Sequence, residues 1–282
     1  IFEIIQENAI KSWLSLKPKP EIILLGDEKG TKEISEKYSL IYIPDIFKND
    51  KNTPFLNDIF LKAYKVASND LVMFINADII INPDLYQIVK SVINSYDNFL
   101  LVGQRLDLEG IDYAIDTAND FWFKELVQKN SNKINLHPPT GIDYFIHKKG
   151  LFDKMPPFLL GRTSYDNWML YYAKEVKKIP LIDLTNIMPV IHQNHPYFHP
   201  EGASGVWHSN EAKYNLKLAG GYGYSYTIED ANYYLDKNYE IKKKKFEFKN
   251  IFKFLKRKIQ RIRDKYFLDN NKNNNVQFLY SI

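Results

Sequence analysis

The chain has 282 residues, of which 45% are hydrophobic and 15% aromatic, a composition that can bury a full core and excludes disorder throughout. Its net charge is only +4, and much of the basic excess lies after Glu240, which argues against nucleic acid as a partner. The absence of cysteine excludes disulfides, thiolate metal sites and a cysteine nucleophile, so Asp, Glu, His or water must hold any metal.

Helical and strand-like patterns alternate over the first hundred residues. Apolar residues recur every three or four positions near the N-terminus, and the Lys17-Pro18 step ends this first helix. Short apolar runs then predict strands at 21–25, 40–43, 71–75 and 99–103, separated by helices at 31–38, 56–67 and 83–93. This order predicts an α/β fold with a mainly parallel sheet flanked by helices.

The second half of the chain is dense in proline, glycine and aromatic residues, but no low-complexity linker separates it from the first half. We therefore expect one domain over residues 1–239, with a loop at 220–224 (GGYGY) that could act as a lid. Residues 240–282 are predicted to form a separate tail, with a basic amphipathic helix at 240–265 and a disordered stretch at 270–275.

The predicted helix at 240–265 has two interpretations. Its apolar residues lie on one side and are flanked by Lys and Arg, the pattern of a helix on an anionic membrane surface. Alternatively, the apolar stripe packs on the domain and the charges are solvated, which is the commoner arrangement. No apolar run is long enough to span a bilayer and no secretory leader opens the chain, so we expect a cytoplasmic protein, peripheral on the inner membrane face in the first case.

The triplet at 76–78 (NAD) follows the most apolar predicted strand. Ligands of open α/β sheets bind beyond the carboxyl ends of the strands. Asp78 at such an end suits a divalent cation, Mn²⁺ or Mg²⁺, whose other ligands are the phosphates of a nucleotide diphosphate. A carboxylate that caps the next turn is the alternative, since Pro83 follows closely.

Residues 74–80 (FINADII) resemble the strand and modified Asp-x-Asp motif of GT-A glycosyltransferases, with Asn76 in place of the first Asp. The resemblance covers about residues 1–225 and extends to four further segments: 53–57 (TPFLN), 140–146 (TGIDYFI), 161–168 (GRTSYDNW) and 192–199 (HQNHPYFH). Together they are similar to a poorly characterised group of bacterial and plant nucleotide-diphospho-sugar transferases. This resemblance implies a GT-A, Rossmann-like fold and a nucleotide-diphospho-sugar donor.

One departure from that family pattern concerns the N-terminus. The GT-A fold usually begins with a strand that contacts the nucleobase, whereas this chain begins with the helix expected to follow it. Either that strand is missing from this chain, or recognition of the base is built differently.

The resemblance assigns a role to Asp166, which matches the carboxylate that deprotonates the acceptor hydroxyl in inverting GT-A enzymes. The alternative is a helix N-terminal Asp stabilised by the macrodipole. The resemblance also implies a late histidine as a further metal ligand. It places His192 or His195 there, and we expect His192.

Five further residues are candidates for binding donor or acceptor. Asn76 belongs to the motif, and Asp143 is suited to sugar hydroxyls, unless it is only a turn residue. Arg105 and Arg162 could bind the diphosphate bidentately, although loop arginines are commonly just solvated. Trp168 could stack on a sugar, or it could belong to the core.

These residues predict a metal-dependent glycosyltransferase, with transfer to an acceptor hydroxyl of a glycan or lipid-linked glycan and inversion at the anomeric carbon. A retaining reaction stays open, because the sequence does not locate the acceptor. A sugar nucleotidyltransferase is one alternative, although residues 26–30 (GDEKG) make a poor phosphate loop. A scaffold protein of glycan assembly that has lost turnover is the other, and the altered Asp-x-Asp motif keeps it open.

Overall fold

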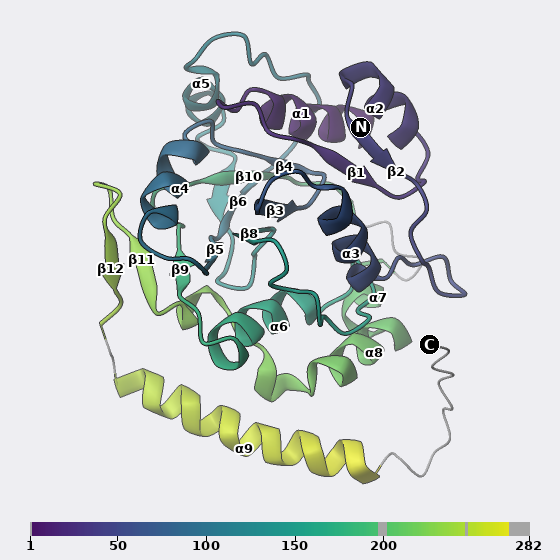
Figure 1. The fold of residues 1–282 in the computed structure, drawn as a ribbon, viewed down its shortest axis with the longest axis vertical. Helices are drawn as coiled ribbons and strands as arrows, with labels where there is room; N and C mark the ends of the chain where they lie inside the picture. The colour runs from purple at the N-terminus through teal and green to yellow at the C-terminus, as the bar shows by residue number, and fades with distance from the viewer. Residues whose placement is uncertain (1, 197–201, 246–247, 271–282) are drawn as a thin grey trace.

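Helices and strands alternate along the chain in the computed structural model, which describes residues 2–196, 202–245 and 248–270 (Figure 1). The described α-helices are α1 (Phe2–Leu14), α2 (Thr31–Tyr38), α3 (Leu56–Val66), α4 (Leu85–Ile93), α5 (Trp122–Lys129), α6 (Tyr165–Tyr171), α7 (Gly202–His208), α8 (Asn210–Ala219) and α9 (Phe248–Asn270). A π-helical turn, η1 (Tyr172–Val176), continues α6, and two 3₁₀ turns follow α8: η2 (Tyr222–Tyr224) and η3 (Ile228–Asp230). The predicted alternation of helices and strands over the first hundred residues is confirmed.

The strands form three sheets of different size. The largest has six strands in the order β12 (Ile241–Lys243), β11 (Tyr233–Leu235), β9 (Leu181–Asp183), β5 (Leu100–Val102), β8 (Tyr144–Lys148) and β3 (Leu71–Ile75). A four-stranded sheet has the order β4 (Ile79–Ile80), β10 (Val190–Gln193), β6 (Arg105–Leu108) and β7 (Ile134–Leu136). The remaining pair is β1 (Ile23–Leu25) and β2 (Ile41–Ile43).

The largest sheet is mixed, which corrects the prediction of a mainly parallel sheet. β9 runs parallel to both β5 and β11, but β8 is antiparallel to both of its neighbours and β12 is antiparallel to β11. The difference arises because β8 belongs to the second half of the chain and inserts, antiparallel to both neighbours, between β3 and β5. Its register places Phe145 opposite Phe74 and Tyr144 opposite Ile75.

Helices cover both faces of this sheet, because successive residues of a strand point to opposite sides. Leu100 and Val102 face a core built with α3 and α6, whereas Leu101 between them faces a core built with α1 and α4. Phe145 and Ile146 of β8 divide between the two cores in the same way. The fold is therefore α/β, with mixed sheets flanked by helices.

The four-stranded sheet has a core of its own beneath α5. Ile80 of β4, Leu108 of β6 and Ile191 of β10 are buried against Trp122 and Phe123 of α5. α1 holds the same sheet from the other side through two hydrogen bonds: the Trp13 indole donates to Ile79 O at 2.9 Å and Ile81 N donates to Ser12 Oγ at 3.1 Å.

Among the described strands, β1 and β2 pair only with each other. β3 is an edge strand of the largest sheet and pairs only with β8. Leu24 and Leu25 nevertheless pack against the two cores that also receive side chains of β3. The residues of β1 and of β3 are only half-buried, although 71–75 (LVMFI) is among the most apolar stretches of the chain. The small sheet thus extends the central layer without being hydrogen-bonded to it.

The C-terminal part of the chain differs from the predicted tail. Residues 241–243 form β12 at the edge of the largest sheet, so the helix begins only at Phe248 and runs past the predicted end to Asn270. Figure 1 shows α9 along one side of the molecule, beyond α6 and α8. Residues 271–275 of the predicted disordered stretch lie outside the described residues. None of the described helices combines the length and the apolar character needed to cross a bilayer.

Residues 222–224 of the run at 220–224 form the turn η2, which packs against α9, where the sequence predicts a loop. Gly223 N donates to Asp264 Oδ2 at 2.8 Å, and Arg261 Nε donates to Gly223 O at 3.0 Å. A Cβ on Gly223 would lie 2.9 Å from Arg261 N and 3.1 Å from Arg257 O, so the helix backbone leaves no space for a side chain. Glycine at this position therefore allows α9 to approach the domain.

Gly223→Ala should accordingly displace α9, because overpacking against backbone atoms costs about 1–3 kcal/mol. Limited trypsin digestion is the measurement, since α9 is rich in Lys and Arg, and cleavage within 248–270 should accelerate. Tyr222→Ala is the matched control, because its side chain in the same turn is 66% exposed. Equal cleavage rates for the two variants would contradict the close approach.

Candidate metal centre

The pairing of β4 with β10 brings Asp78 and His192 together. Asp78 precedes β4 directly, and Ile79 lies opposite His192 in the antiparallel register. Gln193 fixes the Asp78 backbone, because its N–H and its side-chain amide both donate to Asp78 O, at 3.3 and 3.1 Å. The same amide donates to Ile5 O of α1 at 2.8 Å. The carboxylate is thus carried by backbone that two elements hold in place.

Two histidines face this carboxylate. His195 Nε2 lies 3.1 Å and His192 Nε2 lies 3.4 Å from Asp78 Oδ2. The three residues each offer a ligand atom, and these atoms all lie within 4.8 Å of one another. The sequence expectation of Asp78 and His192 is therefore one residue short of the cluster, because His195 joins it from the segment that follows β10.

The charges of this cluster support one another. Burial raises the pKa of Asp78, but the hydrogen bonds from His192 and His195 outweigh it and hold the pKa well below its usual range. The pKa of His195 is in turn raised, chiefly by its hydrogen bond to Asp78. The carboxylate is therefore ionised, and its Oδ1 is buried without a hydrogen-bond partner among the described residues.

These features fit a divalent cation. Buried polar atoms almost always have a partner, so the unpaired Oδ1 of Asp78 indicates a ligand that completes it. A carboxylate with two imidazoles suits a first-row transition metal better than Mg²⁺, which takes oxygen ligands. Three protein ligands also leave coordination positions for phosphate oxygens or water.

A second polar network adjoins the cluster. Arg105 Nη1 donates to Asp143 Oδ2 and Arg105 Nε donates to Asp107 Oδ1, both at 2.8 Å. His137 Nδ1 lies 2.6 Å from Asp107 Oδ2, and Asn76 Nδ2 donates to Asp143 Oδ1 at 2.7 Å. Burial lowers the pKa of Arg105 and the two carboxylates raise it, with a net rise. The guanidinium is therefore charged and bonded to both carboxylates.

The two networks meet at His192. Its Nδ1 forms a hydrogen bond of 2.7 Å with Asn194 Oδ1, in which the amide oxygen accepts, and lies 3.4 Å from Asp107 Oδ1. A metal-binding His commonly has such an oxygen on its second ring nitrogen, which fixes the ring orientation. Asp107 thus links the metal cluster to Arg105.

Asp166 is the second residue of α6, and its carboxyl group is largely removed from solvent. Burial raises the pKa of its carboxyl from 3.8 to about 6, with Asp143 as a further cause. The backbone N–H groups of Asn167 and of Asp166 itself oppose this rise. Oδ1 of Asp166 is buried and has no hydrogen-bond partner in the described part of the chain. Buried polar atoms usually have a partner, so this oxygen is open to a further contact.

Tyr165 lies within electrostatic range of three carboxylates. Burial raises the pKa of its hydroxyl far above the usual range, and Asp166, Asp143 and Asp78 each raise it further. The three acidic groups therefore lie close enough to one another to act on one phenol. The structure thus brings Asp78, His192, Asn76, Arg105, Asp143 and Asp166 into one region.

Arg162 and Trp168 lie in other surroundings. Arg162 donates to Glu211 Oε2 through Nε and Nη2, at 2.8 and 2.6 Å, and so connects its loop to α8. Trp168 is buried in the core below α6 and stacks on Tyr172 with ring centroids 4.6 Å apart. The core interpretation of Trp168 agrees with this position, and no contact joins either residue to the metal cluster among the described residues.

Sequence reasoning missed Asp107 and His137, and it gave His195 only as an alternative to His192. The alternation of residues 105–108 (RLDL) carried a signal, because a period of two places Arg105 and Asp107 on one face of a strand. His137 follows β7, which pairs with β6, and that pairing has no local signature. His195 could be separated from the other late histidines only by the position of β10.

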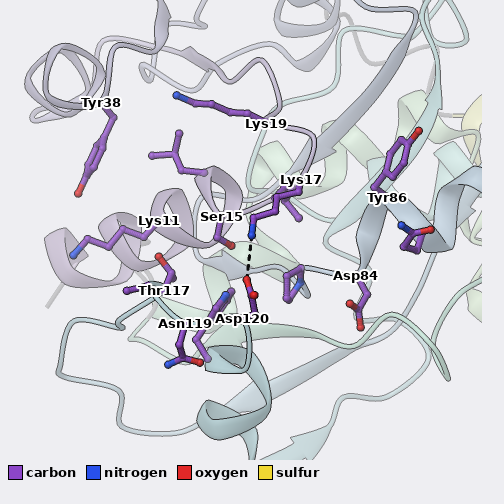
Figure 2. Close-up of a pocket in the computed structure, with 16 residues that line it drawn as sticks. Lys11, Ser15, Lys17, Lys19, Tyr38, Asp84, Tyr86, Thr117, Asn119 and Asp120 are labelled. Carbon is purple, nitrogen blue, oxygen red and sulfur yellow. Dashed lines mark hydrogen bonds and ion pairs between the residues drawn. The ribbon is translucent and has the colours of Figure 1, made fainter.

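An open groove of about 870 Å³ lies elsewhere, between the end of α1, the start of α4 and the loop before α5 (Figure 2). It contains three lysines, and Figure 2 shows Lys17 paired with Asp120, at 3.1 Å, across the groove. Neither Asp78 nor the histidines of the cluster line it. The groove is therefore separate from the metal cluster.

No protein-family model matches the chain, and no curated protein matches it either. The function is therefore argued from the site itself.

Asp78→Asn should abolish metal binding by this cluster, because it removes the only carboxylate of the triad. We expect Mn²⁺ affinity to fall by more than about 100-fold, since losing even an outer partner of a ligand costs 10- to 100-fold. Titration calorimetry with Mn²⁺ alone is the measurement. Asp84→Asn, at an exposed carboxylate close in sequence, should bind Mn²⁺ as the wild type does. Unchanged affinity in Asp78→Asn would contradict the assignment.

The raised pKa of Asp166 predicts a pH-dependent penalty on folding. Between pH 3.8 and about 6 the folded chain retains a proton that the unfolded chain has lost, so stability falls as pH rises through this window. The full penalty, about 3 kcal/mol at most, is present above it.

Asp166→Asn, which removes the buried charge, should therefore gain stability relative to wild type as pH rises. Denaturant unfolding at about pH 4 and about pH 7.5 measures this difference. A stability difference that does not change with pH would show that the carboxyl is not destabilised by burial.

Proposed function

We propose that this chain is a metal-dependent glycosyltransferase that transfers a sugar from a nucleotide-diphospho-sugar to an acceptor hydroxyl of a glycan or lipid-linked glycan. The observation that supports it best is that two groups act electrostatically on the same residue, Tyr165. One is the cluster of Asp78, His192 and His195. The other is Asp166, a carboxylate with a raised pKa and an unpaired buried oxygen. The resemblance of the chain's motifs to those of GT-A enzymes supports the same chemistry.

Asp78, His192 and His195 are the residues that would hold the cation, for which we propose Mn²⁺. A bound divalent cation supplies positive charge that stabilises a diphosphate leaving group. Asp107 keeps the ring of His192 in place, and Gln193 keeps the backbone of Asp78 in place.

Asp166 is the proposed base. Its carboxylate takes the proton of the acceptor hydroxyl while that oxygen forms a bond to the anomeric carbon. The bond from the anomeric carbon to the diphosphate breaks at the same time, and the electron pair leaves with the nucleotide diphosphate. A pKa of about 6 suits this role, because the group is mostly ionised at neutral pH and still basic enough to accept a proton. Attack from the face opposite the leaving group inverts the configuration.

Asp143 and Arg105 are proposed to position the neighbouring residues of the site and to set the pKa of Asp166. The Arg105 guanidinium is bonded to Asp107 and Asp143, so it is better suited to hold these carboxylates than to bind the diphosphate directly. Its charge also lowers the pKa of Asp166 and opposes the effect of Asp143. The pKa of Asp166 therefore depends on the balance between Asp143, which raises it, and Arg105, which lowers it.

This network also accounts for Asn76 in the first position of the Asp-x-Asp motif. Asn76 Nδ2 donates to Asp143 Oδ1 at 2.7 Å. An Asp at position 76 would place two carboxylates at that distance, where like charges disfavour ionisation. The amide is thus the chemically suited partner of Asp143, and the change of motif does not by itself indicate lost turnover.

A screen of nucleotide-diphospho-sugars with and without Mn²⁺ tests the proposal. The expected result is Mn²⁺-dependent release of nucleotide diphosphate with transfer of the sugar to an added acceptor. Exchange of pyrophosphate into the donor would instead identify a nucleotidyltransferase. Binding of donor without any turnover would identify a scaffold protein, and either outcome rejects the proposal.

Asp166→Asn should lower the turnover rate by about 10²- to 10⁴-fold and leave donor affinity unchanged, because a base acts only in the chemical step. The wild-type rate should fall as pH drops below about 6, since the base is then protonated. Steady-state kinetics across pH provide both measurements. Asp112→Asn, at an exposed carboxylate, is the control. A weaker donor affinity with an unchanged rate would contradict the role of a base.

A further inference from the structure

Helix α9 is docked on the domain by its polar face. Arg257 donates to both carboxylate oxygens of Asp230, at 2.6 and 2.7 Å, and its guanidinium lies 4.0 Å from the centre of the Tyr226 ring. Arg261 lies 4.6 Å from the ring centre of Tyr224. The helix residues on this face follow a spacing of three and four: Lys253, Arg257, Gln260, Arg261 and Asp264.

The opposite face of α9 is apolar and exposed. Ile262 and Tyr266 are 70% and 72% exposed, although large apolar side chains are normally buried. Five positions form a continuous stripe with helical spacing, and two further aromatic residues adjoin it: Ile251, Leu255, Ile259, Ile262 and Tyr266, with Phe252 and Phe254. The interpretation in which this stripe packs on the domain is therefore wrong for the described part of the chain.

Basic residues border the stripe on both sides. With 3.6 residues per turn, Lys256 and Arg263 lie along one border, while Lys258 and Lys265 lie along the other. All four side chains are exposed. Lys256, Arg263 and Lys265 form no ion pair with another described residue. The outward face thus combines an apolar centre with two uncompensated rows of positive charge.

We propose that this face of α9 binds the surface of a bilayer that contains anionic lipids. The helix would lie in the interfacial plane, with the apolar stripe among the acyl chains and the basic borders at the head groups. A helix of 23 residues offers a contact about 35 Å long.

The arrangement of charge favours lipid over other partners. Lysine is depleted at protein–protein interfaces, whereas it is suited to the head groups of anionic lipids. A nucleic acid would contact the basic borders but would leave the apolar stripe uncovered. Aromatic residues within the stripe, such as Phe252 and Tyr266, are also typical of membrane interfaces.

The docking contacts give this proposal a structural consequence. Because Arg257 and Arg261 hold the polar face on the domain, a helix bound to a membrane would hold the whole domain against it in one orientation. This inference rests on the exposure and charge of α9 alone and does not depend on the proposed transferase activity.

Sedimentation of the full chain with vesicles is the test. Vesicles of phosphatidylserine and phosphatidylcholine should bind the chain at low salt, with weaker binding at high salt, and vesicles of phosphatidylcholine alone should bind little. The triple variant Leu255→Ser, Ile259→Ser, Ile262→Ser should no longer bind the anionic vesicles, at low or at high salt. The charge variant Lys256→Gln, Lys265→Gln should bind the anionic vesicles about 25-fold more weakly, at about fivefold for each basic residue.

Phe121→Ser is the matched control, because it removes an equally exposed apolar side chain, 69% against 70% for Ile262, directly before a different helix, α5. It should bind as the wild type does. Circular dichroism and trypsin digestion should show that α9 stays helical and docked in the stripe variant, whose polar face is unchanged.

The absence of vesicle binding by the wild type, or binding that the stripe variant retains, would overturn the proposal. Equal binding to both kinds of vesicle would do the same. A wild-type dimer that the stripe variant abolishes, without vesicle binding by either, would assign the stripe to a second copy of the chain.

Discussion

The insertion of β8 between β3 and β5 is the constraint on which the site depends. It brings the residue before β8, Asp143, beside the end of β3, where Asn76 N donates to Asp143 O at 3.1 Å. Arg105 N donates to Gly141 O in the same segment, at 3.2 Å. Asp143 thereby reaches Asn76, Arg105 and the field of Asp166 at once. A strand parallel to β3 in this position would instead begin at the opposite edge of the sheet, and the residue before it could not reach Asn76.

Local patterns predicted the elements of the first hundred residues better than their pairing. The apolar runs at 71–75 and 99–103 and the helices around them have short-range signatures of period and length. The direction of β8 is set by contacts with strands about 50 to 70 residues earlier, such as Phe74 with Phe145, which no local pattern encodes. Residues 241–243 were likewise predicted as the start of a helix. They form β12 instead, because pairing with β11 overrides the helix propensity of their lysines.

The site residues follow the same division. Asp78 could be proposed because it lies three residues after an apolar strand, and Asp166 because it lies at the start of a helix within a segment that resembles GT-A enzymes. The ion pairs of Arg105 were not predictable, since an exposed arginine and one held between Asp107 and Asp143 look alike in sequence. The pKa of Asp166 likewise depends on burial by elements distant in the chain. Chemistry that arises from convergence of segments therefore required the fold.

Helix α9 shows how far amphipathicity alone can lead. The spacing of its apolar residues is equally typical of a helix that packs on a core and of one that faces a membrane. The decision lies in the surface that receives the helix. Gly223, which has no side chain, and Asp230, which is buried and acidic, form a surface suited to Arg257 and Arg261 and unsuited to an apolar stripe. Because the Arg257 side chain on the domain-facing side of α9 pairs with Asp230, the apolar residues of the helix face outward. The basic residues that border this outward face then determine which kind of partner it suits.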